Sequence, residues 1–378
     1  MSVTERMWKI WNGGPLRLGV VLGLIYVFLV GVSSLEVGIR FLGEDTQERL
    51  FSAATNPIAA LCIGILGTVL VQSSSASTSI IVGLVASGVI GVDDAIPMVM
   101  GANIGTTVTN TLVSLGHIRQ SGEFRRAFAA ATVHDFFNLL AVAVLLPLEL
   151  LFGIISNTAE WLSERLVGSA GTEWKSPIKA WVKQPVEWLE SIWESLGANG
   201  TIEGVLLVVT GLVIILSALT LITKNMRALV AERVERSVNA MLSRGGGALA
   251  MALGLGITIA VQSSSITTSI LVPLAGAGVI TLRNAYPVTL GANVGTTITA
   301  LLASLAASSP EALTVALAHT TFNVFAILAL YVIPIARNLP IIAAERLADV
   351  AVERRTLAVA YVAVMFIVLP LIGVVALG

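Results

Sequence analysis

The sequence has little of what disulfides, metal centres and charged binding surfaces require. Cys62 is the only cysteine among 378 residues, which excludes an intramolecular disulfide and any metal site built on paired cysteines. Lys, Arg, Asp and Glu together make up 12% of the chain, about half the share in an ordinary soluble domain. The net charge is −1, so there is no basic face for nucleic acid. We therefore expect no nucleic acid partner and no resident cofactor.

Long uncharged stretches take the place of the missing charge. No charged residue occurs over 50–92 or over 245–282, and the mean hydropathy of the chain is +0.90. A helix that crosses a bilayer needs about 20 consecutive apolar residues. The sequence therefore predicts an all-α polytopic membrane protein, with the lipid bilayer as its surroundings.

The chain contains a duplicated segment. Residues 71–110 align without a gap to residues 261–300, with 22 identities in 40 positions and a constant offset of 190. Both copies contain Gln-Ser-Ser-Ser near their start, and GANIGTT in the first copy corresponds to GANVGTT in the second. A further match, VHDFFN from Val133 and AHTTFN from Ala318, follows at an offset of 185. Because the matches include the polar residues, the two halves are predicted to share one ancestor.

The distribution of Lys and Arg predicts the topology, because cytoplasmic loops carry an excess of these residues. By this rule segments 1–17, 117–126 and 223–246 lie inside, and the acidic segments 36–49 and 156–203 lie outside. The first uncharged stretch then has to enter and leave the membrane on the same side, as a re-entrant helical hairpin. The second begins on the inside, so the two hairpins, each with its QSSS motif, enter from opposite faces. We expect their tips to meet near the middle of the membrane and to enclose one site.

Such an inverted-topology repeat is typical of secondary transporters. Between the halves, Trp181 and Trp188 favour a helix anchored at the membrane interface, with a lid or partner surface as the alternative. The predicted organisation has four parts: a first repeat over 1–155 with a span, the hairpin and two further spans, a Trp-rich extracytoplasmic linker over 156–203, a second inverted repeat over 204–336, and an amphipathic segment with a C-terminal span over 337–378.

The Gln-Ser-Ser-Ser tips are the candidate substrate site. Irregular backbone inside a bilayer is tolerated where it is buried in protein or lines a water-filled cavity. A tip followed by a helix offers hydroxyls and free backbone N–H groups, and the helix dipole favours an anion. The GAN motifs add amide and hydroxyl oxygens, which are suitable ligands for Na⁺. No Lys or Arg occurs in either motif region before Arg119 and Arg283, so we expect the anion and Na⁺ to bind together, each raising the affinity for the other.

Asp135 is the only acidic residue in its apolar stretch. A functional role is one interpretation, because ionisable residues within membranes usually serve a function. An ion pair with Arg125 or Arg126, near the start of the same helix, is the other interpretation. The matching position of the second half is Thr320, so any role of Asp135 is asymmetric.

Three stretches resemble a known family: the duplicated QSSS, the motif GANIGTTVTNT, and FRRAFAAATVHDFFNLLAVAVLLPLE. They make the region from about residue 57 to 336 similar to the type II sodium–phosphate cotransporter family, and the short chain suggests a bacterial member. The resemblance implies uptake of inorganic phosphate coupled to Na⁺ by alternating access. It also implies a multi-pass protein of the plasma membrane, here the bacterial inner membrane, and leaves a homodimer open.

The resemblance and the repeat also assign residues. The hairpin residues and two polar residues beyond them are expected to bind phosphate: Gln72, Ser73, Ser74, Ser75, Gln262, Ser263, Ser264, Ser265, Asn138 and Thr299. Residues in and after the GAN motifs are expected to bind Na⁺: Asn103, Thr106, Thr107, Asn293, Thr296, Thr297, Asn323, Gln120 and Asp135. The electrogenic animal members have Asp and Gln where this chain has Gln120 and His117, and often a Ser where it has Ala102 and Ala292. One sodium site is therefore expected to be altered or missing, which leaves stoichiometry and electrogenicity open.

Three other functions fit the sequence less well. A serine hydrolase needs a base beside its nucleophile, and QSSS has no Gly-x-Ser-x-Gly elbow, although His134 or His319 could approach in space. We expect these two histidines, which match each other, to pack around the site without binding a ligand. An ion channel needs no anion-binding hairpins, although GANIGTT resembles a carbonyl-lined filter. A sodium-coupled carrier of another small anion is the nearest alternative, but the absence of a fixed Arg argues against a carboxylate substrate. We expect a transporter and not an enzyme.

Overall fold

The computed structural model describes residues 14–43, 46–47, 52–167, 178–244, 246–307 and 309–378. These residues form helices and contain no β-strand; η1 is a 3-10 turn, and η2 and η3 are π-helical. The elements in chain order are α2 (Gly14–Phe41), η1 (Ser52–Thr55), α4 (Pro57–Val71), α5 (Ser74–Ser87), α6 (Val92–Thr106), α7 (Val108–Leu115), α8 (Ser121–Phe152), α9 (Ile154–Val167), α10 (Lys179–Ser195), α11 (Gly200–Arg244), α12 (Gly247–Val261), α13 (Ser264–Gly276), α14 (Leu282–Ala306), α15 (Pro310–Ala326), η2 (Ile327–Val332), α16 (Pro334–Glu353), α17 (Arg355–Ala363), η3 (Val364–Val368) and α18 (Leu369–Leu377).

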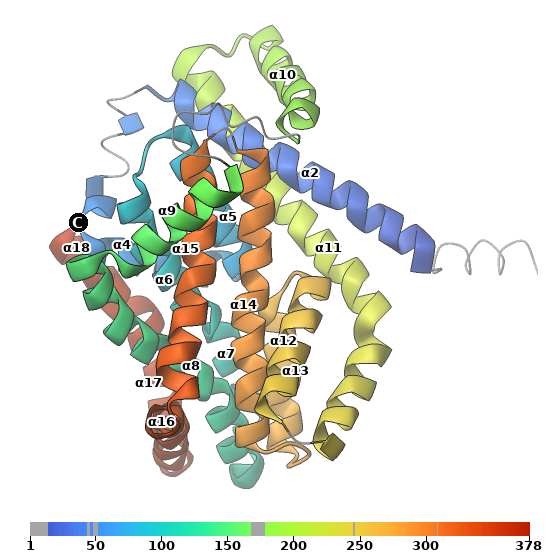
Figure 1. Cartoon of the computed structure of the whole chain (residues 1–378), viewed down its shortest axis with the longest axis vertical. Helices are drawn as coiled ribbons and strands as arrows, with labels where there is room; N and C mark the ends of the chain where they lie inside the picture. Colours follow the sequence, from blue (N-terminus) through green and yellow to red (C-terminus); the bar gives the residue numbers. More distant parts are fainter. Residues whose placement is uncertain (1–13, 44–45, 48–51, 168–177, 245, 308) are drawn as a thin grey trace, which may run out of the picture.

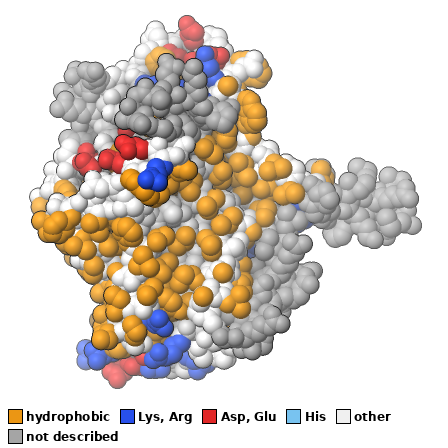
Figure 2. Space-filling model, in the orientation of Figure 1, with side chains coloured by type: hydrophobic (Ala, Val, Ile, Leu, Met, Phe, Trp, Pro, Cys, Tyr) orange, Lys and Arg blue, Asp and Glu red, His pale blue; other side chains and the backbone are white. Residues whose placement is uncertain are grey.

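Six helical segments of the described chain are long and apolar enough to cross a membrane. Figure 2 shows a belt of hydrophobic side chains between two charged ends, as expected for lipid-facing surface. The prediction of an all-α polytopic membrane protein is confirmed. The six segments are Leu16–Phe41, Ser121–Phe152, Gly200–Arg227, Leu282–Ala306, Pro310–Val332 and Arg355–Leu377.

Two helical hairpins lie at the predicted positions. The helices α4 and α5 meet at Gln72, and α12 and α13 meet at Gln262. Both glutamines have a φ of 56°, and no other non-glycine residue of the described chain has a positive φ. The four helices have 13 to 15 residues, fewer than the roughly 20 needed to cross a bilayer. In Figure 1 the first hairpin lies in the upper half of the molecule and the second in the lower half; entry from opposite faces of a membrane stays a prediction.

The first helix of each hairpin packs closely against the helix that follows the hairpin. A Cβ atom on Gly64 of α4 would lie 2.0 Å from the Met98 carbonyl oxygen of α6. A Cβ atom on Gly254 of α12 would lie 1.9 Å from the Val288 carbonyl oxygen of α14. Both pairs of positions differ by the repeat offset of 190. Because only glycine permits such an approach, the duplicated glycines fix each hairpin on its neighbouring helix.

The helices after the hairpins differ between the halves. Helix α14 continues without a break over 25 residues, whereas its counterpart divides at Thr107 into α6 and α7. Outside the hairpins, α2 packs along α11. There a Cβ atom on Gly38 would lie 2.6 Å from the Val208 backbone nitrogen, and one on Gly211 would lie 2.7 Å from the Leu35 nitrogen. This closely packed pair crosses beside the hairpins (Figure 1).

The linker and the C-terminal part also form helices. Trp181 and Trp188 on α10 are exposed, which is compatible with the predicted interfacial helix, and residues 168–177 of the linker lie outside the described residues. The segment expected before the last span forms helix α16, and the last span follows directly; its amphipathic character stays a prediction. Most of the predicted cytoplasmic segment 1–17 lies outside the described residues.

Candidate substrate and sodium site

Each hairpin tip ends one helix and begins the next within two residues. Gln72 caps the end of α4, and the Ser73 hydroxyl caps the start of α5 by accepting the Ala76 N–H at 3.2 Å. Gln262 and Ser263 repeat this arrangement in the second hairpin. The left-handed backbone at each glutamine reverses the chain. The free N–H groups at the start of α5 and α13 therefore lie at the tips.

The two tips contact each other. The Ser75 hydroxyl donates to the Gln262 carbonyl oxygen at 3.4 Å, although the two residues are 187 positions apart. The Thr299 hydroxyl lies between them, 3.3 Å from Ser75 Oγ and 2.9 Å from Gln262 Oε1. The expected meeting of the tips is thus present, and three of the predicted phosphate-binding residues take part in it.

Thr109 belongs to the tips but is missing from the residues that the sequence predicted. Its hydroxyl donates to Gln72 Oε1 at 3.2 Å, in the same way that Thr299 contacts Gln262. The repeat could have predicted Thr109, because position 109 corresponds to the predicted Thr299 at the repeat offset of 190.

The tips offer donors without positive charge. Ser74, Ser75 and Ser264 are buried, with 3%, 4% and 2% of their surface exposed. The first N–H groups of α5 and α13 have no partner within their helices, and the helix dipoles add partial positive charge at the same point. An anion between the tips would therefore be held by neutral groups.

A buried network of amides and histidines crosses between the two halves. Asn103 of α6 donates to Asn323 Oδ1 on α15 at 2.9 Å, and its own Oδ1 lies 3.2 Å from His319 Nε2. The asparagine of the first GAN motif is thus paired with the His and Asn of the second half. All three side chains are buried.

The second GAN motif makes the reciprocal contact. Asn293 of α14 donates to Asn138 Oδ1 on α8 at 2.8 Å, and its Oδ1 lies 2.6 Å from His134 Nε2. Asn138 also donates to the Asn103 carbonyl oxygen at 2.9 Å, which joins the two sets. Four of the predicted residues therefore form one network, and both histidines contact these amides as supporting residues.

Asn110 was also missing from the predicted residues. Its Oδ1 accepts from the hydroxyls of Thr268 at 2.8 Å and Ser269 at 3.2 Å, both on α13. Its Nδ2 lies 3.2 Å from His134 Nδ1. The matching position of the second half is Ala300, so the repeat gave no signal for this contact.

Asp135 is fully buried and has hydroxyl partners. Tyr361 donates to its Oδ2 at 2.9 Å and Thr111 at 3.2 Å. The ion pair with Arg125 or Arg126 considered from the sequence is wrong. Arg125 pairs with Asp349, and Arg126 donates to the Gly276 carbonyl oxygen at 2.9 and 2.5 Å.

The predicted threonines are buried within their helices. The hydroxyls of Thr106, Thr107, Thr296 and Thr297 all donate to a carbonyl oxygen three or four residues earlier. Each hydroxyl oxygen keeps lone pairs with which it could bind a cation. Among the described residues no group of three or more His, Cys, Asp or Glu is placed to hold a metal. The neutral oxygens that contact Asp135, the hydroxyls of Thr111 and Tyr361, suit Na⁺ better than a transition metal.

Gln120 does not lie with these residues. It is exposed at the start of α8 beside Glu123, about 22 Å along the helix from Asp135 at 1.5 Å per residue. His117 lies at the same end, 3.3 Å from Glu123 Oε2. The structure therefore gives no contact between Gln120 and the buried network.

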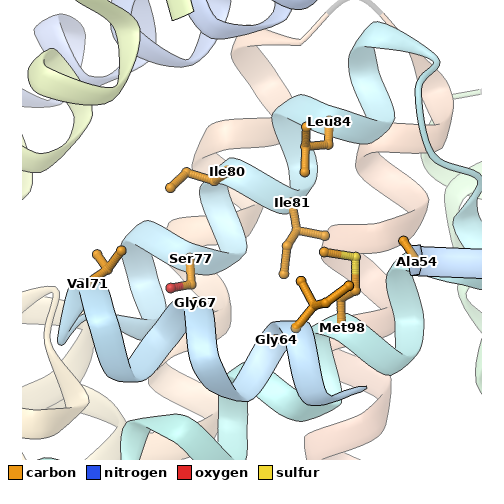
Figure 3. Close-up of a pocket in the computed structure, with 10 residues that line it drawn as sticks. Ala54, Gly64, Gly67, Val71, Ser77, Ile80, Ile81, Leu84 and Met98 are labelled. Carbon is orange, nitrogen blue, oxygen red and sulfur yellow. The ribbon is translucent and has the colours of Figure 1, made fainter. Parts of the chain in front are cut away.

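The first hairpin also contains an apolar cavity of about 210 Å³. Figure 3 shows Ile80, Ile81 and Leu84 of α5 facing Gly64 and Gly67 of α4 across it. It contains no charged residue and is not suited to an anion.

Known proteins share this sequence over most of its length. The family model described as Na⁺/Pi-cotransporter matches residues 27–163 and 214–372. Sodium-dependent phosphate transport protein 2A of Rattus norvegicus is 36% identical, over 94% of this chain and 67% of its own length. Sodium-dependent phosphate transport protein 2B of Homo sapiens is 34% identical, over 94% of this chain and 64% of its own length. No solved structure matches this chain. The chain belongs to the Na⁺/Pi-cotransporter family.

Proposed function

We propose that this protein imports inorganic phosphate together with Na⁺ across a plasma membrane, in a bacterium the inner membrane. The observation that carries the proposal is the contact between the two hairpin tips, where Ser75 meets Gln262 and Thr299. The names of the relatives describe sodium-dependent phosphate transport.

Phosphate would lie between the tips, where its oxygens can accept from the N–H groups at the start of α5 and α13. The hydroxyls of Ser74, Ser75, Ser264 and Ser265 add donors. Charge-assisted hydrogen bonds from backbone N–H groups to an oxyanion are among the strong ones in proteins. Because no basic side chain of the described residues contacts the tips, co-bound Na⁺ would lower the cost of placing the anion in the membrane.

Sodium would bind at the buried oxygens around the amide network and Asp135. Asn103 and Asn293 connect the halves there, and Asp135 is the acidic group of the site. A cation at these oxygens strengthens phosphate binding, and by reciprocity phosphate strengthens sodium binding.

Transport by alternating access follows if the hairpins move against a rigid part of the molecule. The glycine contacts between α2 and α11 make that pair a candidate scaffold. A crosslink between α2 and α5, which are in contact, should therefore stop uptake while phosphate still binds.

The function is tested by uptake of radiolabelled phosphate into proteoliposomes with and without an inward sodium gradient. We expect accumulation only with the gradient, and weaker uptake for Ser74→Ala and Ser264→Ala. Competition by unlabelled sulfate in the same assay distinguishes phosphate from other small anions. Equal uptake without sodium, or unchanged uptake in both serine variants, would contradict the proposal.

A further inference from the structure

A second cavity, which is polar, lies at the base of the second hairpin, away from the tips. It has a volume of about 230 Å³, room for several waters at about 30 Å³ each. It is formed where the starts of α12, α14 and α16 come together. Its lining includes Gly246, Gly247, Arg283, Tyr286, Tyr331 and Arg337.

Two arginines of this cavity have unused donors. Arg337 donates through Nε to the Tyr331 carbonyl oxygen at 2.6 Å and lies over the Tyr331 ring at 4.6 Å. Arg283 donates through Nη1 to Asn338 at 3.2 Å. Neither forms an ion pair with an acid of the described chain. The Tyr331 contacts hold the Arg337 guanidinium in place, and its two Nη atoms have no hydrogen bond within that part of the chain.

Tyr286 gives an independent indication of a ligand. Its side chain lines the cavity and is 1% exposed, and its hydroxyl has no hydrogen-bond partner among the residues that the structure describes. A buried hydroxyl without a partner is costly. The start of α12 also faces this cavity, and its cap residue Gly246 has no side chain to satisfy the free N–H groups.

The first half has no equivalent of this site. Arg283 corresponds to Asp93 at the repeat offset, Asn284 to Asp94, and Tyr286 to Ile96. At these matching positions the first half thus has two aspartates, whereas the second half has an arginine and a tyrosine. The cationic cavity is therefore not a by-product of the duplicated fold.

We propose that this cavity binds the phosphate group of an anion, held by Arg283, Arg337, the Tyr286 hydroxyl and the N-terminus of α12. Guanidinium groups and helix N-termini both favour phosphate. The phosphate could belong to an anionic lipid head group, since the cavity lies at the end rich in arginine that the sequence assigns to the cytoplasm, or it could be free inorganic phosphate.

The test uses purified full-length protein in nanodiscs, in sodium-free potassium buffer. The lipid arm compares phosphatidylcholine discs with and without phosphatidylglycerol, and measures the melting temperature and the phosphatidylglycerol retained in native mass spectrometry. The free-phosphate arm titrates inorganic phosphate into phosphatidylcholine discs. We expect Arg283→Gln with Arg337→Gln to weaken binding in one arm by about tenfold or more, as for loss of charge-assisted hydrogen bonds.

Three further variants make the result specific. Arg346→Gln removes an exposed arginine of the same helix α16 outside the cavity and should change nothing. Tyr286→Phe removes a hydroxyl that has no partner in the described part of the chain, so the fold should persist while binding weakens. Ser75→Ala, at the tips, should leave this binding intact, which separates it from the proposed transport site. Equal binding by wild type and the double arginine variant in both arms, or an equal loss in Arg346→Gln, would overturn the proposal.

Discussion

The two halves share one framework but surround it with different side chains. In both, the glutamine turns, the capping serines and the close glycine contacts coincide at the offset of 190. The first half alone adds Asn110, Thr111 and Asp135, where the second has Ala300, Leu301 and Thr320. Duplication thus builds a symmetric pair of tips, where we propose that the anion binds, and polar residues present in one copy only give the first half contacts that the second lacks.

The second helix of each hairpin ends at an arginine from another helix, but the two arginines come from different parts of the chain. Arg40 of α2 donates to the Ala86 carbonyl oxygen at the end of α5 at 2.9 Å. Arg126 of α8 donates to the Gly276 carbonyl oxygen at the end of α13. Positions 86 and 276 are equivalent, but the arginines come from helices that are not. In each case a guanidinium stabilises the negative end of a helix dipole.

The largest effect is expected where the halves are most alike. Gly64→Ala and Gly254→Ala should each destabilise the protein by about 3 kcal/mol or more, because the new Cβ would meet backbone that cannot move aside. Gly67→Ala on α4 and Gly256→Ala on α12 are controls on the same two helices, since nothing lies within 4 Å of their Cβ positions. Melting temperatures in detergent should fall for Gly64→Ala and Gly254→Ala and not for the controls. A lower melting temperature for only one of these two variants would show that the two glycine contacts are not equivalent.

Asp135, which has no acidic counterpart in the second half, should affect the sodium dependence of uptake and not the stability of the fold. Asp135→Asn keeps the shape and the Tyr361 contact but removes the charge. We expect the sodium concentration for half-maximal uptake to rise about tenfold, as for loss of a charged partner worth roughly 1.5 kcal/mol. Thr320→Val, the matched change in the second half, should leave it nearly unchanged. An unaltered sodium dependence of uptake in Asp135→Asn would show that this residue does not take part in sodium binding.

Replacing Asn110 with Ala makes the first half resemble the second. It removes the acceptor of Ser269 and one of the acceptors of Thr268, and it leaves His134 Nδ1 without its partner. The expected cost in unfolding free energy is about 1–3 kcal/mol, measured by thermal or denaturant unfolding. Ser269→Ala, which removes one of these contacts, should cost less. Equal costs would show that the amide itself contributes little.

Thr109 and Thr299, which contact the tip glutamines, should contribute differently to phosphate affinity. Thr299→Val removes contacts to both Gln262 and Ser75, whereas Thr109→Val removes the single contact to Gln72. We expect phosphate affinity to fall about fivefold, near 1 kcal/mol, for Thr299→Val and less for Thr109→Val. Equilibrium binding of labelled phosphate in sodium checks the order, and a larger effect at Thr109 would contradict it.

The smallest effect concerns the end of the molecule where the second hairpin has its base. The Arg125 guanidinium beside Asp349 lowers the pKa of that carboxyl below its ordinary value. Because the folded-state pKa is lowered, the stabilisation is full above the ordinary aspartate pKa and is lost as the pH falls through the lowered one. The pair is exposed, so it contributes less than about 1 kcal/mol. Asp349→Asn should lower the melting temperature slightly at neutral pH, and the difference should vanish in strong acid.

The repeat made the hairpins and their meeting predictable, because identical polar residues recurred at one offset. It could not show that Asn103 pairs with the histidine of the other half, since spacing along the chain carries no information on which helices touch. Tyr361 lies on a final span without a repeat counterpart, so its contact with Asp135 had no signal. The ion pair considered for Asp135 was wrong because Arg125 and Arg126 lie about ten residues away, roughly 15 Å along a helix.

Binding of labelled phosphate to purified protein at increasing sodium concentration tests the central claim most directly. If the two tips form one cation-coupled site, phosphate affinity rises with sodium. Ser75→Ala and Ser265→Ala should then each weaken it, although the two serines belong to opposite hairpins. A phosphate affinity that does not change with sodium concentration, or that falls for a serine variant of one hairpin only, would show that the two tips do not form a shared, cation-coupled site.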